Sequence, residues 1–320
     1  MISESFEQPL VIGIDAGGTR VRAYCADARG RVVGMGDSGP GNALSVPPAD
    51  LVRHLAQAMG TAAPEGVRSR VTAVAGGFAG AGPGRGRDTA ASCLAEALEA
   101  LDISAVAAEV YGDADVAFAS GPGAPADGLV LIAGTGAIAG RVVGRRCAQT
   151  VDGHGWLLGD KGSGFWLGRE AARAAVLALD GRGPWGPLVG SVLEQVTPES
   201  PDAGLPLAER TRLRDAIADW AYSRPPVALA RLSPLVVAAG ADGDPTARSL
   251  LDRAADELAD KVGALAPRSG ELLVTTGGLI GPEGPLAERL AERVRPMGLR
   301  VAAVRDGAAG AVALARLLTR

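Results

Sequence analysis

Two segments of this chain share one pattern, in which a strand leads through a glycine-rich turn into a second strand, and they lie about 120 residues apart. The turns are Asp15-Ala-Gly-Gly-Thr-Arg20 and Gly134-Thr-Gly136. Apolar runs and alternation predict the flanking strands at residues 10–14, 21–25, 31–36, 129–133, 137–143 and 147–151. The repeat predicts a duplicated α/β architecture, with sheets that are covered by helices.

The connection made by the first turn excludes two common nucleotide-binding motifs. A dinucleotide-binding fingerprint and a Walker loop both join a strand to a helix, whereas this turn joins a strand to a strand. Neither GxGxxG nor GxxxxGK[ST] occurs at this turn, and the first lysine of the chain is Lys161. Any nucleotide bound at this turn must therefore be held in another way.

The rest of the chain carries mostly helical patterns. Apolar residues at helical spacing predict helices at 87–101, 164–179, 206–221, 227–240, 244–266 and 306–318. Residues 271–276 form a predicted strand that runs into Gly277-Gly278. The stretch 181–205 is rich in Pro and Gly, and we expect it to loop out. His54 lies in a helical stretch, and we expect its side chain at the surface.

Composition narrows the class of protein. A length of 320 residues suggests roughly two domains, and a net charge of −4 argues against nucleic acid as the main partner. No run of about 18 apolar residues is present, and the polar N-terminus is unlike a signal peptide. The three cysteines, Cys25, Cys93 and Cys147, are far apart and form no CxxC pair, which argues against disulfides and structural zinc. We expect a cytoplasmic protein without a membrane partner.

The two glycine turns are candidate phosphate sites. Gly17 and Gly18 allow backbone amides to approach an anion closely, and Thr19 adds a hydroxyl donor. Asp15 is compatible with a phosphate only if a cation such as Mg²⁺ lies between them. The alternative is a tight hairpin whose Asp bonds its own turn. Gly134-Thr-Gly136 also combines glycines with a threonine hydroxyl between two strands. Two facing hairpins could therefore hold a polyphosphate between two domains.

Asp113 is the candidate general base. It follows a predicted strand and precedes a short predicted helix at 116–120, so it lies at the carboxyl end of a strand, where α/β sheets form ligand crevices. There it could take a proton from a substrate hydroxyl. The alternative role is a helix N-cap. For Asp115, a cap or first-turn position is the expected role.

Residues 152–166 form the densest candidate ligand loop. Five of them are glycines, which makes the segment too irregular for the core. Asp160 could accept hydrogen bonds from sugar hydroxyls, whereas His154 has no second histidine nearby and is not expected to bind metal. In another loop, Asn42 offers a donor and an acceptor, or is simply a turn residue. Gly277-Gly278 could let an adenine lie flat against the backbone.

Five motifs occur in the order seen in the BadF/BadG/BcrA/BcrD ATPase family: GIDAGGTR at 13–20, GDAD at 112–115, AGTGA at 133–137, GWLLGDKGSGFWLG at 155–168 and TTGG at 275–278. From Ile12 to the terminal helix, the chain resembles this family of the actin-like, sugar kinase and Hsp70 ATPase superfamily, and within it the N-acetylglucosamine kinases. The resemblance implies a two-domain α/β actin-like ATPase fold, a duplicated ribonuclease H-like fold with a central inter-domain cleft. We expect domains at 1–118 and 119–305, with a terminal helix at 306–320 that packs back on the first domain.

The resemblance also implies roles for individual residues. ATP would be bound through its phosphates and adenosine by Gly17, Gly18, Thr19, Arg20, Gly134, Thr135, Gly136, Gly277 and Gly278. Asp15 would lie near Mg²⁺, and Asp113 would be the catalytic base. The sugar would be contacted by Asn42, Asp113 and Asp160, with Gly153 and His154 beside them.

The implied activity is ATP-dependent phosphorylation of an amino sugar, with N-acetylglucosamine at its 6-hydroxyl as the first expectation, by a homodimer. Two departures leave the sugar open among N-acetylglucosamine, glucosamine and N-acetylmuramate. Lys161 stands where the family often has Glu, and His154 where N-acetylglucosamine kinases can carry Trp. A second branch of the family activates dehydratases through a cysteine-held iron–sulfur cluster at a dimer interface. The three cysteines match no such pattern, and an ATP-driven activator remains the alternative.

Overall fold

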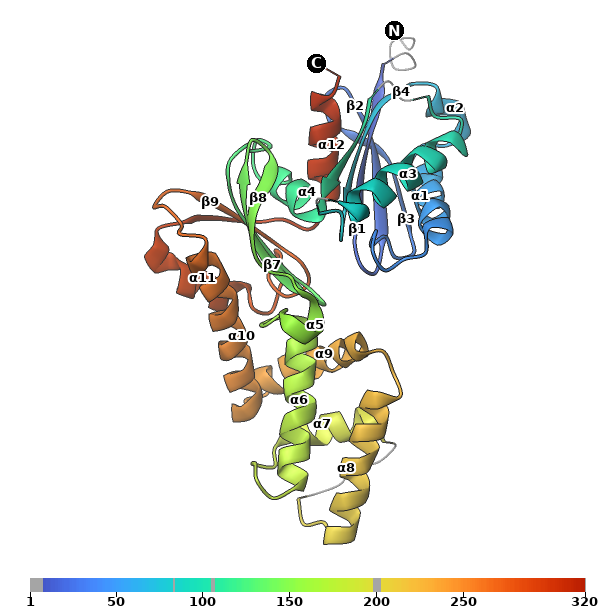
Figure 1. Cartoon of the computed structure of the whole chain (residues 1–320). Helices are drawn as coiled ribbons and strands as arrows, with labels where there is room; N and C mark the ends of the chain where they lie inside the picture. The colour runs from blue at the N-terminus through green and yellow to red at the C-terminus, as the bar shows by residue number, and fades with distance from the viewer. Residues whose placement is uncertain (1–7, 83, 105–106, 198–202, 320) are drawn as a thin grey trace.

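Two mixed sheets organise the molecule (Figure 1). The computed structural model describes residues 8–82, 84–104, 107–197 and 203–319, and within these ranges the strands form two five-stranded sheets. The first has the order β3-β2-β1-β4-β5 and the second β10-β9-β6-β7-β8. The strands are β1 (Leu10–Ala16), β2 (Val21–Asp27), β3 (Val32–Ser38), β4 (Val71–Phe78), β5 (Ala107–Gly112), β6 (Gly128–Ala133), β7 (Ala137–Val143), β8 (Arg146–Asp152), β9 (Leu272–Thr276) and β10 (Arg300–Ala303).

Both sheets have the same internal plan. The middle strand β1 pairs antiparallel with β2 and parallel with β4, and β6 pairs antiparallel with β7 and parallel with β9. The predicted glycine turns therefore do connect strand to strand in each sheet. The duplicated α/β fold class predicted from the two turns is confirmed.

Helices cover both faces of the first sheet. They are α1 (Pro48–Ala62), α2 (Glu65–Arg68), α3 (Arg85–Glu99), α4 (Asp113–Ala119) and α12 (Ala308–Leu317). Alternation along β1 divides its side chains, because Ile12 and Ile14 join the core with α1 and α3, whereas Val11 joins the core with α12. The last helix of the chain thus lies against the first strand (Figure 1). This contact places residues 306 and 307 beside the end of β1.

At Gly13 the strand β1 lies directly against the backbone of α12. A Cβ atom built there would lie 2.2 Å from the backbone nitrogen of Val312, so only glycine fits without movement of the helix. We expect Gly13→Ala to destabilise the protein by about 1–3 kcal/mol, the usual cost of overpacking. Urea unfolding measures the change. Gly66→Ala is the control, because nothing lies within 4 Å of a Cβ there, and an equal loss in both variants would contradict the steric argument.

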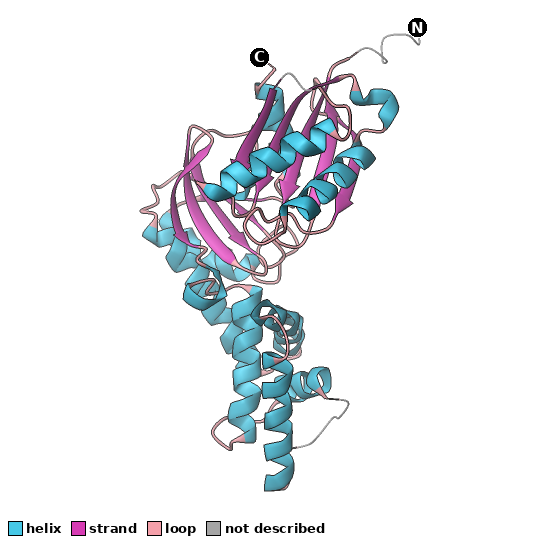
Figure 2. Ribbon diagram, turned by 45° about the vertical axis from the view of Figure 1, so that its right-hand side comes forward, coloured by secondary structure: helices cyan, strands magenta, loops and turns pink. Residues whose placement is uncertain are grey.

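Helices also pack on the second sheet and extend well beyond it (Figures 1 and 2). They are α5 (Gly155–Leu158), α6 (Gly164–Leu179), α7 (Pro187–Val196), α8 (Leu207–Tyr222), α9 (Ser233–Ala241), α10 (Pro245–Ala264) and α11 (Ala287–Val294), with 3₁₀ segments at Pro226–Leu232 and Arg295–Met297. The largest hydrophobic core among the described residues joins β6, β7 and β9 to helices α6 to α11. Leu129 and Leu131 of β6 face that core, whereas Val130 faces α4.

The short helix α4 is shared between the sheets. Val116 belongs to the core with α12, whereas Phe118 belongs to the core with the second sheet. Arg146 of β8 reaches across the same junction, with its guanidinium 3.8 Å from the ring centroid of Tyr111 and paired with Glu109. Because α4 begins at Asp113, the candidate base lies at this junction between the two sheets.

Two local predictions were wrong. The stretch 181–205 was expected to loop out, yet it contains α7; residues 198–202 lie outside the described residues. Pro187 starts this helix at a position that needs no N–H donor, and four apolar side chains of the helix are buried. His54 was expected at the surface, but it is 9% exposed and its Nδ1 lies 2.8 Å from the carbonyl oxygen of Pro40. The helical stretch around His54 is α1, and the buried face of this helix extends to His54 beside Leu55.

Across the described ranges, no helix has the length and apolarity that crossing a bilayer requires.

Candidate functional site

The first glycine turn leaves donors free. Its ends are joined by the N–H of Gly17, which donates to the carbonyl of Arg20 at 2.9 Å. Among the described residues, the backbone N–H groups of Gly18 and Thr19 find no hydrogen-bond acceptor, and both residues are exposed. Free amides and a hydroxyl at an exposed turn are the donors that an anion needs. Arg20 is exposed and lies 3.8 Å from Asp37, so its guanidinium is in a loose ion pair.

The second glycine turn is hydrogen-bonded to the first residues of helix α6. The N–H of Gly134 donates to Gly136 at 2.9 Å, which closes the turn. The carbonyls of Gly134 and Thr135 accept from the first residues of α6, Gly164 at 2.8 Å and Phe165 at 3.1 Å. Within the described chain, the amides of Thr135 and Gly136 donate no hydrogen bond. The turn is thus held through its carbonyls and keeps its amides for a ligand.

Asp113 is the first residue of α4, directly after β5. Burial raises its pKa to about 6, and the nearby carboxylate of Asp15 adds to the rise. The capping role falls instead to Asp115, whose Oδ2 accepts from the N–H of Gly112 at 2.9 Å, as predicted. Asp113 therefore has the position and the pKa of a general base near neutral pH.

Asp15 lies at the end of β1, where the chain's last helix meets it. Its Oδ2 accepts from the N–H of Gly307 at 3.0 Å, and Arg22 Nη1 lies 4.0 Å from the same oxygen. Arg22 is also 3.8 Å from Asp306. Burial raises the pKa of Asp15, and Asp306 adds to the rise, against the lowering effects of Gly307 and Arg22. The site has an excess of carboxylates over cations.

This carboxylate excess fits a magnesium ion. The carboxylate of Asp15 is close enough to Asp113 to raise the pKa of that group. Mg²⁺ is usually held by one or two carboxylates together with substrate phosphates. The free amides of the first turn lie a few residues from Asp15 and would take the phosphates. The residues present therefore fit Mg²⁺ bound with a nucleotide.

Asp160 links the candidate ligand loop at residues 152–166, called the sugar loop below, to the second glycine turn. Its Oδ1 accepts from the N–H of Ala137 at 3.0 Å, and its backbone has a positive φ of 58°. Burial raises its pKa, whereas the bond from Ala137 and the nearby charges of Lys261 and His154 oppose the rise. His154 itself is exposed. Gly153 has a φ of 76°, and a Cβ there would lie 2.6 Å from Ile138.

Asn42 and Gly277 each lie beside one of the glycine turns. The oxygen Oδ1 of Asn42 accepts from the backbone N–H groups of Leu44 and Ser45, at 2.9 and 3.1 Å. This is the turn role left open above, and it leaves the side-chain NH₂ to donate. Gly277 has a φ of 100°, and a Cβ there would lie 2.3 Å from the carbonyl oxygen of Ala133. Gly278 is exposed beside it.

The structure gathers the predicted residues into two groups. The first group contains Asp15, Gly17, Gly18, Thr19, Arg20, Asn42 and Asp113, and the second contains Gly134, Thr135, Gly136, Gly153, His154, Asp160, Gly277 and Gly278. No hydrogen bond or ion pair between described residues joins the groups. The ends of the two sheets that carry these turns approach each other in both views (Figures 1 and 2).

The model of the BadF/BadG/BcrA/BcrD ATPase family matches residues 12–315 of this chain. The chain belongs to that family. It is 27% identical over 305 residues to an N-acetyl-D-glucosamine kinase of Dictyostelium discoideum, covering 89% of this chain and 90% of that protein. It is 29% identical over 216 residues to an N-acetylmuramic acid/N-acetylglucosamine kinase of Clostridium acetobutylicum, covering 65% of this chain and 66% of the relative.

Among solved structures, a candidate N-acetylglucosamine kinase from Chromobacterium violaceum is similar over 96% of this chain and 99% of its own, with a TM-score of 0.72 and 25% identity. The predicted family and the actin-like fold class are confirmed.

Four residues of this BadF/BadG/BcrA/BcrD family member were missed from the sequence. Arg22 and Asp306 flank Asp15, but only the return of α12 brings Asp306 there, and no local pattern signals that return. Asp152 and Lys261 form an ion pair of 3.2 Å at the base of the sugar loop. For Lys261 the sequence did carry one signal, because it is one of only two lysines in a chain whose other basic residues are arginines.

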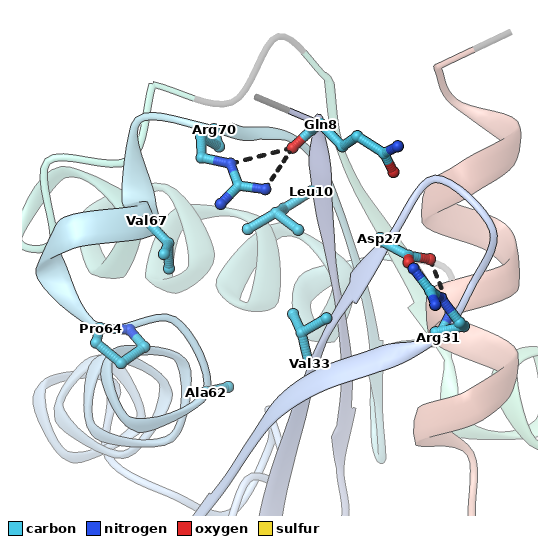
Figure 3. A pocket seen from close by; sticks show the side chains of 9 residues that line it. All are labelled: Gln8, Leu10, Asp27, Arg31, Val33, Ala62, Pro64, Val67 and Arg70. Carbon is cyan, nitrogen blue, oxygen red and sulfur yellow. Dashed lines mark hydrogen bonds and ion pairs between the residues drawn. The ribbon is translucent and has the colours of Figure 1, made fainter. Parts of the chain in front are cut away.

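Figure 3 shows a cavity of about 560 Å³ in the first sheet's half of the molecule. Leu10, the first residue of β1, and Asp27, the last of β2, line it, so it is about 20 Å from the glycine turn at the other end of these strands. Its two arginines are already bonded, Arg31 to Asp27 at 2.7 Å and Arg70 to the carbonyl of Gln8 at 2.8 Å. None of the predicted site residues lines this cavity.

Proposed function

We propose that this protein is an ATP-dependent kinase that phosphorylates an amino sugar, with N-acetylglucosamine, at its 6-hydroxyl, as the first candidate. The observation that carries the proposal is Asp113, a carboxylate at the carboxyl end of a strand with a pKa of about 6, beside Asp15. The relatives named above act on N-acetylglucosamine, and one of them also on N-acetylmuramic acid.

In the proposed reaction Asp113 accepts the proton of the sugar hydroxyl as that oxygen attacks the γ-phosphorus of ATP. The bond from the γ-phosphorus to the β,γ-bridging oxygen breaks, and ADP leaves. Little covalent chemistry falls to the protein, so positioning and charge neutralisation supply most of the acceleration. The free amides of Gly18, Thr19, Thr135 and Gly136 would hold the phosphates.

Magnesium, held by Asp15 and the nucleotide phosphates, would neutralise the charge that builds on the leaving group. The Asp15 carboxylate is set for this task by the N–H of Gly307 at 3.0 Å. The same contact ties the metal site to α12.

Closure of the two groups around the ligands is part of the proposal. The groups share no hydrogen bond or ion pair among the described residues, yet one sugar must meet Asn42 of the first and Asp160 of the second. A ligand that bonds to both would draw the sheets together, exclude water and limit wasteful hydrolysis of ATP.

The cysteines give no support to the alternative, an activator with a cysteine-held cluster. Cys25 and Cys93 are buried and belong to the core of the first sheet. Cys147 is partly buried at the junction with α4, where its N–H donates to Asp115 at 2.6 Å.

We expect Thr135→Val to weaken Mg·ATP binding more than sugar binding. The change is nearly isosteric but deletes one hydroxyl donor, and a hydrogen bond to a charged group is worth about 1.5–3 kcal/mol. Titration calorimetry with a non-hydrolysable ATP analogue measures the nucleotide affinity of the variant and of the unaltered protein. An unchanged nucleotide affinity would mean that the second turn is only a hairpin.

The experiment that separates the kinase from the activator is ADP release with and without sugar. A kinase that closes on its substrate releases ADP many times faster when the sugar is present. An activator hydrolyses ATP at the same rate whether or not the sugar is present. Sugar-independent release at the full rate would overturn the proposed function.

A further inference from the structure

Lys261, on α10, is a buried cation at the base of the sugar loop. It is 5% exposed, and its ammonium group lies 3.2 Å from Oδ2 of Asp152. The same group donates to the carbonyls of Lys161 at 2.6 Å and Glu257 at 3.2 Å. A buried ammonium is costly unless it is paired and hydrogen-bonded, and here every contact goes to the loop or to its own helix.

The second oxygen of Asp152 closes the loop on itself. Oδ1 accepts from the N–H of Gly153 at 2.8 Å and from the N–H of Asp160 at 2.7 Å, so one carboxylate holds both ends of residues 152–160. A Cβ at Gly159 would lie 1.9 Å from this oxygen, so a larger residue there would displace the carboxylate.

The two ends of the loop are also held in an uncommon backbone conformation. Asp152 has a φ of 65° and Asp160 a φ of 58°. Non-glycine residues persist in this left-handed region when the surrounding structure fixes them. The Asp152–Lys261 pair supplies such a constraint, and it does so from a helix about 100 residues further along the chain.

We propose that Lys261 and Asp152 are positioning residues for the sugar site: Lys261 fixes the carboxylate of Asp152, which fixes the backbone of Asp160 so that the Asp160 side chain is presented to the sugar. The inference rests on the proposed function, because it takes Asp160 as a sugar ligand. Neither residue need touch the sugar.

The charge of Lys261 acts on Asp160 as well. Burial and the carboxylate of Asp152 raise the pKa of Asp160, whereas Lys261 and His154 lower it. Removal of Lys261 therefore leaves Asp160 to take up a proton at a higher pH than before. Since an ionised Asp160 is the better acceptor for a sugar hydroxyl, sugar binding is then lost at a higher pH as the solution is acidified.

The test is Lys261→Met, compared with Arg289→Met. The control removes a cation of α11 that pairs with Asp252 of α10 at 3.1 Å, away from the loop. We expect Lys261→Met to raise the sugar KM by about 10- to 100-fold, the scale of a misplaced substrate group. The kcat and the ATP KM stay within about twofold, and the pH of half-maximal sugar binding moves upward. Arg289→Met keeps all of these values.

A second variant and a sugar-free measurement keep the outcome decisive. Asp152→Asn retains an oxygen for the N–H of Asp160 but loses the charge that Lys261 pairs with, so it carries the sugar KM and hydrogen-exchange measurements if Lys261→Met does not fold. Hydrogen exchange of residues 153–160 in the sugar-free protein should be faster in either variant than in the control.

Each outcome decides one claim. Unchanged sugar KM and unchanged exchange in a folded variant overturn the positioning role. Equal losses for sugar and ATP also overturn it, because they indicate a general structural defect. If the wild-type protein phosphorylates no amino sugar, the proposed function fails by itself, and the exchange measurement still reports whether Lys261 holds the loop.

Discussion

Asp113→Asn should reduce turnover by about 10²–10⁴-fold, the usual effect of removing a general base. The amide has nearly the same shape, so it can still accept from the N–H of Ala114, as Asp113 Oδ1 does at 2.9 Å. We therefore expect the fold and the nucleotide affinity to remain. Steady-state kinetics measure turnover, and Asp215→Asn, at an exposed position of α8, is the control.

The pH profile checks the same role in the unaltered protein. The pKa of Asp113 is raised from 3.8 to about 6, so the base is ionised above that pH and protonated below it. kcat/KM, which reports on the free enzyme, should therefore fall as the pH drops through about 6. Wild-type turnover in Asp113→Asn, or a profile that stays flat well below pH 6, would remove Asp113 from this role.

Asp160 gives the second large effect, and two substitutions divide its two roles. Its carboxylate is the proposed acceptor for a sugar hydroxyl, and its Oδ1 accepts from Ala137 beside the second glycine turn. Asp160→Asn keeps an oxygen for Ala137 but loses the charge, whereas Asp160→Ala loses both. A hydrogen bond to a charged group is worth about 1.5–3 kcal/mol, which corresponds to about a 10- to 150-fold rise in sugar KM.

Both variants should raise the sugar KM, and only Asp160→Ala should also weaken ATP binding. Initial rates with each substrate varied in turn give the two constants. If Asp160→Asn keeps the wild-type sugar KM, the carboxylate serves only to hold the turn, and another residue must bind the sugar.

Local patterns predicted the parts of the fold that local forces decide. Alternating or continuous apolar residues located β1, β2, β6 and β7, because each strand buries its own side chains against a neighbouring core. Once these strands were located, the glycine-rich segments between them could be predicted as strand-to-strand turns. The burial of His54 and the helix within 181–205 were missed, since each depends on which face of a helix meets the core.

The contacts that complete the site are non-local. Gly307 reaches Asp15 across almost the whole length of the chain, and Lys261 reaches Asp152 across about 100 residues. No spacing within either segment indicates its partner. The carboxylate of Asp160 shows the same limit, because its type suggested a sugar contact, whereas its bond to Ala137 became visible only in three dimensions.

The central claim is phosphoryl transfer to an amino sugar, and product detection tests it most directly. N-acetylglucosamine, glucosamine and N-acetylmuramate are each incubated with ATP, Mg²⁺ and the protein, and ADP and sugar phosphate are quantified in the same sample. We expect one sugar phosphate for each ADP, fastest with N-acetylglucosamine, and almost none from Asp113→Asn. ADP formed without any sugar phosphate from all three would contradict the kinase and favour an ATP-driven activator.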